Sequence, residues 1–173
     1  MKIKVSDISE TGLHILTFRK PEWLINVPDL ISGEDGTNLS SNLNFDLRVT
    51  RVLKEVAVQG KIWFSIESPC ARCLRDVDLI ITPEVNLVLS PGNVSDEKDN
   101  KGDIQHEAYS GDEIDLGDYL REVITMSLPI KVLCDEECRG LCASCGANLN
   151  TRECSCREDW VDSRFGVLRN LKI

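Results

Sequence analysis

Six of the eight cysteines in this chain lie within one short stretch, LCDEECRGLCASCGANLNTRECSC, which runs from Leu133 to Cys156. They are spaced C-x3-C-x3-C-x2-C-x8-C-x-C, and the other two form an upstream C-x2-C pair at Cys70 and Cys73. Thiols in such patterns bind metal ions, form disulfides or catalyse thiol exchange. The three chemistries differ in the compartment and the local backbone that they require.

Metal binding is the chemistry that this spacing favours. Structural zinc takes four thiolates in a tetrahedron, and a C-x2-C turn directs two of them at one ion. In CASCG, the glycine after the second cysteine permits the tight turn. Iron–sulfur clusters also take four cysteines, and the sequence leaves them open as an alternative. Because it has no sign of a redox cofactor scaffold, we expect zinc. Two four-cysteine sites would use all eight candidate ligands: Cys70, Cys73, Cys134, Cys138, Cys142, Cys145, Cys154 and Cys156.

The spacing leaves open which four cysteines share an ion. One grouping contains a compact local site made of Cys142, Cys145, Cys154 and Cys156. Its weak point is the C-x-C pair, because two alternate residues converge on one ion only where the chain bends. The other four cysteines would then close a long loop, which links metal binding to folding. A swapped grouping is also open, in which one site is made of Cys134, Cys138, Cys142 and Cys145.

Disulfides and thiol catalysis are less favoured. A chain of 173 residues, 42% of them hydrophobic, can form a core without covalent links, and its start does not resemble a signal peptide. We therefore expect a reducing, cytoplasmic location and no membrane span. A redox C-x2-C pair begins a helix, whereas CARC lies between two strand-like runs. His14 and His106 stand apart from the cysteines in sequence, and we expect no enzyme activity.

Alternating apolar residues predict the strands that hold the upstream cysteine pair. The segment NFDLRVTRVLKEVAVQGKIWFSIES alternates on both sides of Gly60, which suggests a bend or turn, and LRDVDLIITPEVNLVLS follows Cys73. MKIKVSDI and LHILTF are weaker strand candidates. The simplest arrangement of these segments is an antiparallel β-meander.

Helical patterns follow the predicted strands. DLGDYLREVITMSLP predicts a helix capped by Asp115 and ended by Pro129, and DWVDSRFGVLRNLKI predicts a short C-terminal helix. Residues 91–104, acidic and nearly free of apolar side chains, predict a mobile loop. The expected fold class is α+β, with an antiparallel β-meander sheet, one central helix, a cysteine-rich metal-binding tail and a short C-terminal helix. The α+β domain would span 1–132, and the zinc-binding tail, packed on it, would span 133–173.

The charge distribution bears on the kind of partner. The formal net charge is -9, and residues 1–130 carry all of it, with 13 basic and 22 acidic side chains. A general nucleic-acid binder needs a basic face, so a basic protein is the more natural partner for the acidic part. Six basic residues within three positions of a cysteine are expected to compensate the thiolates: Arg72, Arg75, Lys131, Arg139, Arg152 and Arg157.

The motifs CARCLRDV, LPIKVLC, CRGLCASCGANLN, C-x-C and DSRFGVLRNLK together resemble the YceD family, also called large ribosomal RNA subunit accumulation proteins. The resemblance covers about residues 44–173. It implies a bacterial or plastid protein needed for accumulation of large-subunit ribosomal RNA (rRNA), with members often encoded beside a large-subunit ribosomal protein. Some members lack the Cys142–Cys156 group and carry histidine at the Cys134 and Cys138 positions. That pattern implies a shared site made of Cys70, Cys73, Cys134 and Cys138.

The leading hypothesis is a non-enzymatic ribosome biogenesis factor, needed for rRNA accumulation and large-subunit assembly, with structural zinc. Its partner would be a large-subunit ribosomal protein or a pre-ribosomal particle, with direct rRNA contact left open and no membrane or small-molecule substrate. The first alternative is a zinc-ribbon protein that binds RNA directly through the basic C-terminal helix and four basic residues near the cysteines: Lys131, Arg139, Arg152 and Arg157. The second is a thiol redox protein.

Overall fold

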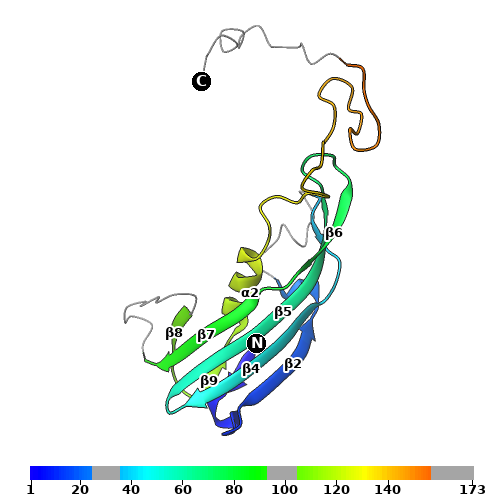
Figure 1. Ribbon diagram of the computed structural model, residues 1–173. Helices are drawn as coiled ribbons and strands as arrows, with labels where there is room; N and C mark the ends of the chain where they lie inside the picture. Colours follow the sequence, from blue (N-terminus) through cyan, green and yellow to red (C-terminus); the bar gives the residue numbers. More distant parts are fainter. Residues whose placement is uncertain (25–35, 93–104, 157–173) are drawn as a thin grey trace, which may run out of the picture.

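The computed structural model describes residues 1–24, 36–92 and 105–156 of the chain. It is mostly β, with 45% of the structure in strands and a single α-helix, α2 (Gly117–Met126), in the described part (Figure 1). The strands are β1 (Lys2–Lys4), β2 (Leu13–Arg19), β3 (Asn38–Leu39), β4 (Leu43–Val52), β5 (Glu55–Pro69), β6 (Asp76–Ile81), β7 (Glu84–Pro91), β8 (Gln105–Tyr109) and β9 (Glu113–Asp115).

The strands of the described residues form a seven-stranded sheet and a two-stranded ribbon. The main path of the sheet is β2-β4-β5-β7-β8, and β3 and β6 also pair with β5. Strand β5 is 15 residues long, so β7 pairs with its first half and β6 with its second half on the same side. The ribbon joins β1 to β9, and β7 and β8 run parallel.

The predicted α+β fold, an antiparallel β-meander sheet with one central helix, is wrong. The sheet branches at β5 instead of passing from each strand to the next, and it contains a parallel pair. The helix α2 lies against one face of a mostly β structure (Figure 1). Periodicity reveals strands but not their partners, and β8, with the sequence QHEAY, lacks the alternation that would reveal it. The weaker strand candidates at the N-terminus are confirmed as β1 and β2.

The core lies between the inner face of the sheet and the layer formed by α2 with the β1–β9 ribbon. Alternate residues of β4, β5 and β7 point into it, and Phe45, Phe64 and Leu47 are almost completely buried. Leu120 and Ile124 of α2 cover them. The opposite, outer face of the sheet carries the exposed alternate residues of the same strands.

Gly60 lies inside a strand and is not a turn. The turn between β4 and β5 is at residues 53–54, where Leu53 has a φ of 57°. Gly60 pairs with Leu47 on one side and with Val85 on the other. A Cβ at this position would overlap the Asp46 carbonyl oxygen and lie 2.9 Å from the Leu47 Cα. Glycine is therefore required here by the close approach of β4.

Helix α2 begins two residues after the predicted cap. The Asp115 Oδ1 accepts a hydrogen bond from the Gly117 N–H at 2.8 Å, so this carboxylate does serve the first turn. The helix ends at Met126, three residues before Pro129. The predicted C-terminal helix and most of the predicted acidic loop lie outside the described residues. No helix of the described residues is long and apolar enough to cross a membrane.

Candidate metal centres

The upstream cysteine pair lies in the turn between β5 and β6. The Leu74 N–H donates to the Cys70 carbonyl oxygen at 2.9 Å, and the Cys70 N–H donates to the Arg75 carbonyl oxygen at 2.8 Å. Leu74, directly after the second cysteine, has a left-handed φ of 58°. This tight turn presents the thiols of Cys70 and Cys73 together, both buried.

The chain after α2 brings two further thiols to this turn. The Ala71 N–H donates to the Val132 carbonyl oxygen at 2.8 Å, which aligns the incoming segment. The sulfur of Cys73 lies 3.5 Å from that of Cys134, and the sulfur of Cys70 lies 3.8 Å from that of Cys138. All four sulfurs lie within 4.8 Å of one another. We call Cys70, Cys73, Cys134 and Cys138 the first centre.

The spacing of these sulfurs fits a metal ion and does not fit disulfides. A disulfide joins sulfurs about 2.05 Å apart, and all eight cysteines are free thiols. Four thiolates bound tetrahedrally at about 2.3 Å lie roughly 3.8 Å apart, which agrees with the distances within the first centre. The surroundings are apolar, since Val77, Leu133 and Leu141 pack against the group.

The electrostatics of the first centre also favour a cation. Burial opposes ionisation of Cys70, but backbone donors, of which the Arg72 N–H is the strongest, outweigh it and lower the pKa of Cys70 to about 6. The hydrogen bond with Cys138, followed by burial, raises the pKa of Cys134 to about 12. Ionisation of neighbouring thiols together is therefore opposed by repulsion between the thiolates, and a bound cation compensates that repulsion.

The other four cysteines form a second group, Cys142, Cys145, Cys154 and Cys156, whose sulfurs also lie within 4.8 Å of one another. We call this group the second centre. The Gly146 N–H donates to the Cys142 carbonyl oxygen at 2.9 Å, and Gly146 has a φ of 70°, so this turn repeats that of Cys70 to Leu74. The backbone N–H groups of Cys145 and Ser144 lower the pKa of Cys142 to about 6.

The two centres differ in exposure. Three thiols of the first centre are buried, whereas Cys145 and Cys156 of the second are exposed and the other two are half-buried. The second centre lies beyond the ends of β5 and β6, away from the body of the sheet (Figure 1). It is thus an appendix to the first centre, held by a few local contacts.

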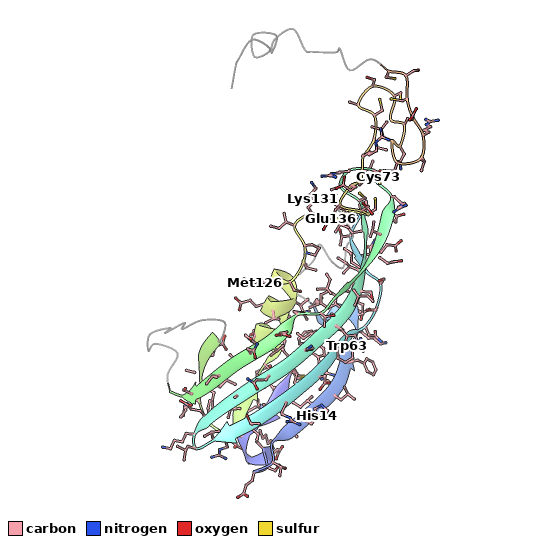
Figure 2. The ribbon with its side chains drawn as sticks, viewed as in Figure 1. His14, Trp63, Cys73, Met126, Lys131 and Glu136 are labelled. Carbon is pink, nitrogen blue, oxygen red and sulfur yellow. The ribbon has the colours of Figure 1, made fainter. Side chains whose placement is uncertain are left out.

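Two side chains that the sequence does not single out as ligands support the first centre. The Arg72 guanidinium donates from Nη1 to the carbonyl oxygens of Glu136 and Cys138, both at 2.9 Å, and so ties the two cysteine loops together. Figure 2 labels Cys73 and Glu136 in the region of this junction. The Asn150 Nδ2 donates to the Cys138 sulfur at 3.3 Å. The sequence predicts that Arg72 compensates thiolate charge, but it gives no signal for Asn150.

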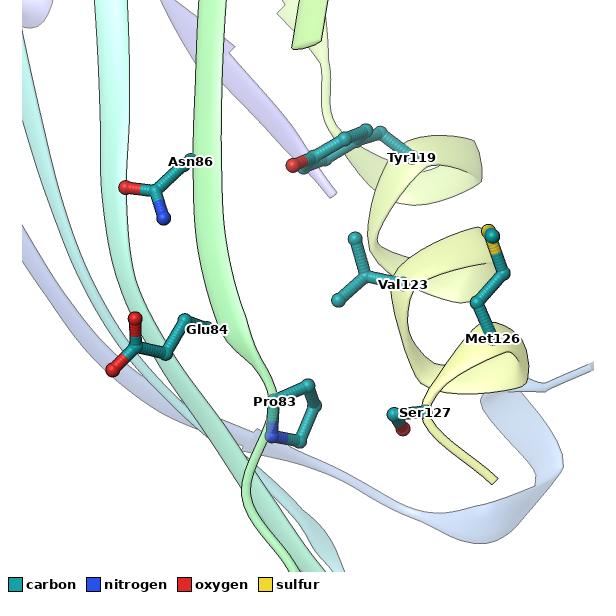
Figure 3. A pocket seen from close by; sticks show the side chains of 7 residues that line it. All are labelled: Pro83, Glu84, Asn86, Tyr119, Val123, Met126 and Ser127. Atoms are coloured by element: carbon teal, nitrogen blue, oxygen red, sulfur yellow. The ribbon is translucent and has the colours of Figure 1, made fainter. Parts of the chain in front are cut away.

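Other candidate groups do not join these centres. His14 pairs with Asp46 at 2.6 Å on the outer face of β2 and β4. A cavity of 270 Å³ between β7 and α2 is lined by Pro83, Glu84, Asn86, Tyr119, Val123, Met126 and Ser127 (Figure 3). Its carboxylate, Glu84, points away from α2 and pairs with Lys61 at 3.8 Å. Among the described residues, the two cysteine groups are therefore the sites with the clearest chemistry.

The two four-cysteine groups are the grouping that the sequence resemblance implies, and each could hold a metal ion. The swapped grouping is not the one that the structure brings together. The bend required of the C-x-C pair is present, because the sulfurs of Cys154 and Cys156 reach the same group. The identity of the metal stays a prediction.

Comparison with known proteins places the chain in a family. A relative from Arabidopsis thaliana, the large ribosomal RNA subunit accumulation protein YCED homolog 1, chloroplastic, is 27% identical over 83% of this chain and 51% of its own length. The Zea mays protein of the same name is 27% identical over 63% of this chain and 46% of its own length. An uncharacterized protein of Mycobacterium leprae is 32% identical over 62% of this chain and 49% of its own length.

The chain thus spans about half the length of these curated relatives. No solved structure matches it. Residues 58–172, which include both candidate centres, match the family described as large ribosomal RNA subunit accumulation protein YceD. The chain therefore belongs to the YceD family.

Proposed function

We propose that this protein is a non-enzymatic assembly factor of the large ribosomal subunit, needed for accumulation of large-subunit rRNA. The observation that carries the proposal is the family match over residues 58–172, because the family is named for that function. The plant relatives carry the same name. The match covers most of β5, the later strands, the helix and both centres, and β1 to β4 precede it.

Zinc is the metal that we propose for both centres. All-thiolate donor sets, tight C-x2-C turns and N–H donors to sulfur are typical of structural zinc. In the first centre, the metal would fix the chain after α2 to the turn between β5 and β6, which joins segments about sixty residues apart. Four protein thiolates leave no open coordination position for a substrate, which supports a structural role and no catalysis.

A basic protein is the partner that we propose, within a large-subunit precursor. The excess of acidic side chains in residues 1–130 would repel phosphate groups and attract lysine and arginine. One basic residue near the cysteines, Arg72, binds backbone carbonyl groups and so is engaged within the protein. Reduced thiols suit a cytoplasmic location.

Depletion of the protein followed by sucrose-gradient sedimentation tests this function. We expect fewer large subunits and less large-subunit rRNA, with small subunits unchanged. Complementation with the wild-type gene should restore the profile, and complementation with a Cys70→Ser/Cys138→Ser variant should not. An unchanged subunit profile after depletion would contradict the proposed function.

A further inference from the structure

The outer face of the sheet carries an apolar stripe in an otherwise polar surface. Four large side chains on it reach solvent, with exposed fractions of 69% for Leu16, 57% for Phe18, 37% for Trp63 and 78% for Ile80. We call these four residues the outer stripe. Each alternates with inward-facing neighbours in its own strand, so all four point away from the core.

Strand register places the four residues as two pairs, Leu16 with Phe18 and Trp63 with Ile80, on either side of Asn44. Phe18 of β2 pairs with Asn44 of β4, and Asn44 pairs with Trp63 of β5. Ser65, two residues beyond Trp63 on the same face, pairs with Ile80 of β6. The stripe thus lies on β2, β5 and β6, roughly at right angles to the strands, with the half-buried Asn44 of β4 between its two pairs. Figure 2 labels Trp63 and His14, which both project from this face.

The rest of this face is polar, as is usual for the water-exposed face of an antiparallel sheet. Near the stripe it carries Asp46, Arg48, Gln59 and Lys61, all exposed. These four apolar side chains do not contribute to the core, since the core is on the other face. An apolar patch with a polar rim indicates a contact surface for another macromolecule.

The charge at one end of the stripe identifies the kind of partner. Glu67 of β5 pairs directly with Asp78 of β6, and Asp76 lies two residues further along the same strand. All three are exposed, and within the described residues none of them forms an ion pair. Carboxylates directly opposite one another in a sheet are destabilising without a cation between them.

We propose that the outer stripe docks a basic segment of a partner protein. Apolar side chains of that segment cover Phe18, Trp63 and Ile80, and its lysine or arginine side chains lie between Glu67 and Asp78. Aromatic side chains can also stack on RNA bases, but the adjacent carboxylates repel the phosphate backbone, so the charge favours a protein. That the segment belongs to a large-subunit ribosomal protein rests on the proposed function.

Two double variants and two matched controls test the surface in the full-length, metal-loaded protein. Phe18→Ser/Ile80→Ser removes exposed apolar anchors, and Leu53→Ser removes a more exposed leucine at the turn between β4 and β5. Glu67→Lys/Asp78→Lys reverses the local charge, and Glu10→Lys/Glu122→Lys makes the same change in net charge elsewhere. The probes are the individual proteins extracted from large subunits and freed from RNA.

We call Phe18→Ser/Ile80→Ser and Glu67→Lys/Asp78→Lys the stripe variants. We expect at least one basic probe protein to bind, and both stripe variants to weaken that binding by about 10-fold or more. The control variants should change it by less than about 2-fold. Absence of binding by every probe protein would overturn the proposal. So would binding of large-subunit rRNA fragments that the stripe variants abolish, or a dimer in light scattering that they convert to monomer. A loss of folding stability as large as that of a core substitution would show that the chain itself covers the stripe, and would also overturn it.

A complementation experiment separates this inference from the proposed function. If depletion lowers large-subunit levels and the stripe variants restore them fully, the proposed function stands and the docking surface is wrong. If depletion has no effect on subunits but the stripe still binds a basic protein, the surface stands and the proposed function is wrong.

Discussion

The Asn150 side-chain amide donates a hydrogen bond to the sulfur of Cys138 at 3.3 Å, so a residue from the loop of the second centre supports a ligand of the first. The same side chain accepts the Arg139 N–H through Oδ1 at 2.7 Å. Nearby, the Leu149 N–H donates to the Gly140 carbonyl oxygen at 2.9 Å. The two centres are therefore connected by a short network and not only by the chain.

Replacing Asn150 should weaken metal binding at the first centre. Asn150→Leu keeps the approximate volume but removes the donor to the Cys138 thiolate, and loss of such a supporting contact lowers metal affinity by about 10–100-fold. Competition with a chromophoric chelator measures the metal affinity of the wild-type protein and of the variant. Glu153→Gln, an exposed neighbour in the same loop, is the matched control. An unchanged affinity in Asn150→Leu would show that the hydrogen bond does not support the ligand.

Single cysteine variants should each remove one of two metal ions. Because their sulfurs belong to one group, Cys70→Ser and Cys138→Ser should lose the same ion, and Cys142→Ser and Cys154→Ser the other. Elemental analysis of purified protein should fall from about two equivalents to about one, and a Cys70→Ser/Cys142→Ser variant should hold none. If Cys138→Ser and Cys142→Ser removed the same ion, the grouping would be wrong.

Substitution of the left-handed residue in each cysteine turn should change the free energy of unfolding in opposite directions. Leu74 and Gly146 occupy the same place after C-x2-C, with φ values of 58° and 70°. A non-glycine residue in this conformation costs about 1–2 kcal/mol. Leu74→Gly should therefore raise the free energy of unfolding by up to about 1 kcal/mol, and Gly146→Leu should lower it by about 1 kcal/mol or more. Chemical denaturation of the metal-loaded protein measures both changes, and a destabilised Leu74→Gly would contradict the argument.

Local pattern predicts most of the strands but not their arrangement. Alternation in LHILTF and around Phe64 marks β2 and β5, yet nothing in it reveals that β5 pairs with both β6 and β7 on one side. That arrangement depends on the length of β5 and on contacts far apart in sequence. The glycine after Cys145 indicates a turn. Leu74 gives no such signal for the equivalent turn, because leucine rarely adopts the left-handed conformation. The role of Asn150 cannot be predicted for a different reason: an asparagine in a loop can have many roles.

Substitution of Gly60 should destabilise the sheet even though the position is within a regular strand. A Cβ there would meet the backbone of Asp46 and Leu47, which cannot move without disturbing the β4–β5 pairing. Gly60→Ala should lower the free energy of unfolding by about 1–3 kcal/mol. Gly92→Ala is the control, because nothing lies within 4 Å of a Cβ at that position. Urea denaturation measures both, and equal effects would show that the close approach is relieved at little cost.

Metal release should occur in two phases, with the second centre first. A chelator or a competing proton reaches Cys145 and Cys156, which are exposed, more readily than Cys70 and Cys138, which are buried. Opening the first centre also requires separation of the loops joined by Arg72. Excess chelator should therefore remove one equivalent rapidly and the other slowly, and Cys142→Ser should abolish the fast phase. Arg72→Met should accelerate the slow phase alone, because it frees the Cys134–Cys138 loop without touching the second centre. A fast phase that survives in Cys142→Ser would instead assign the labile ion to the first centre.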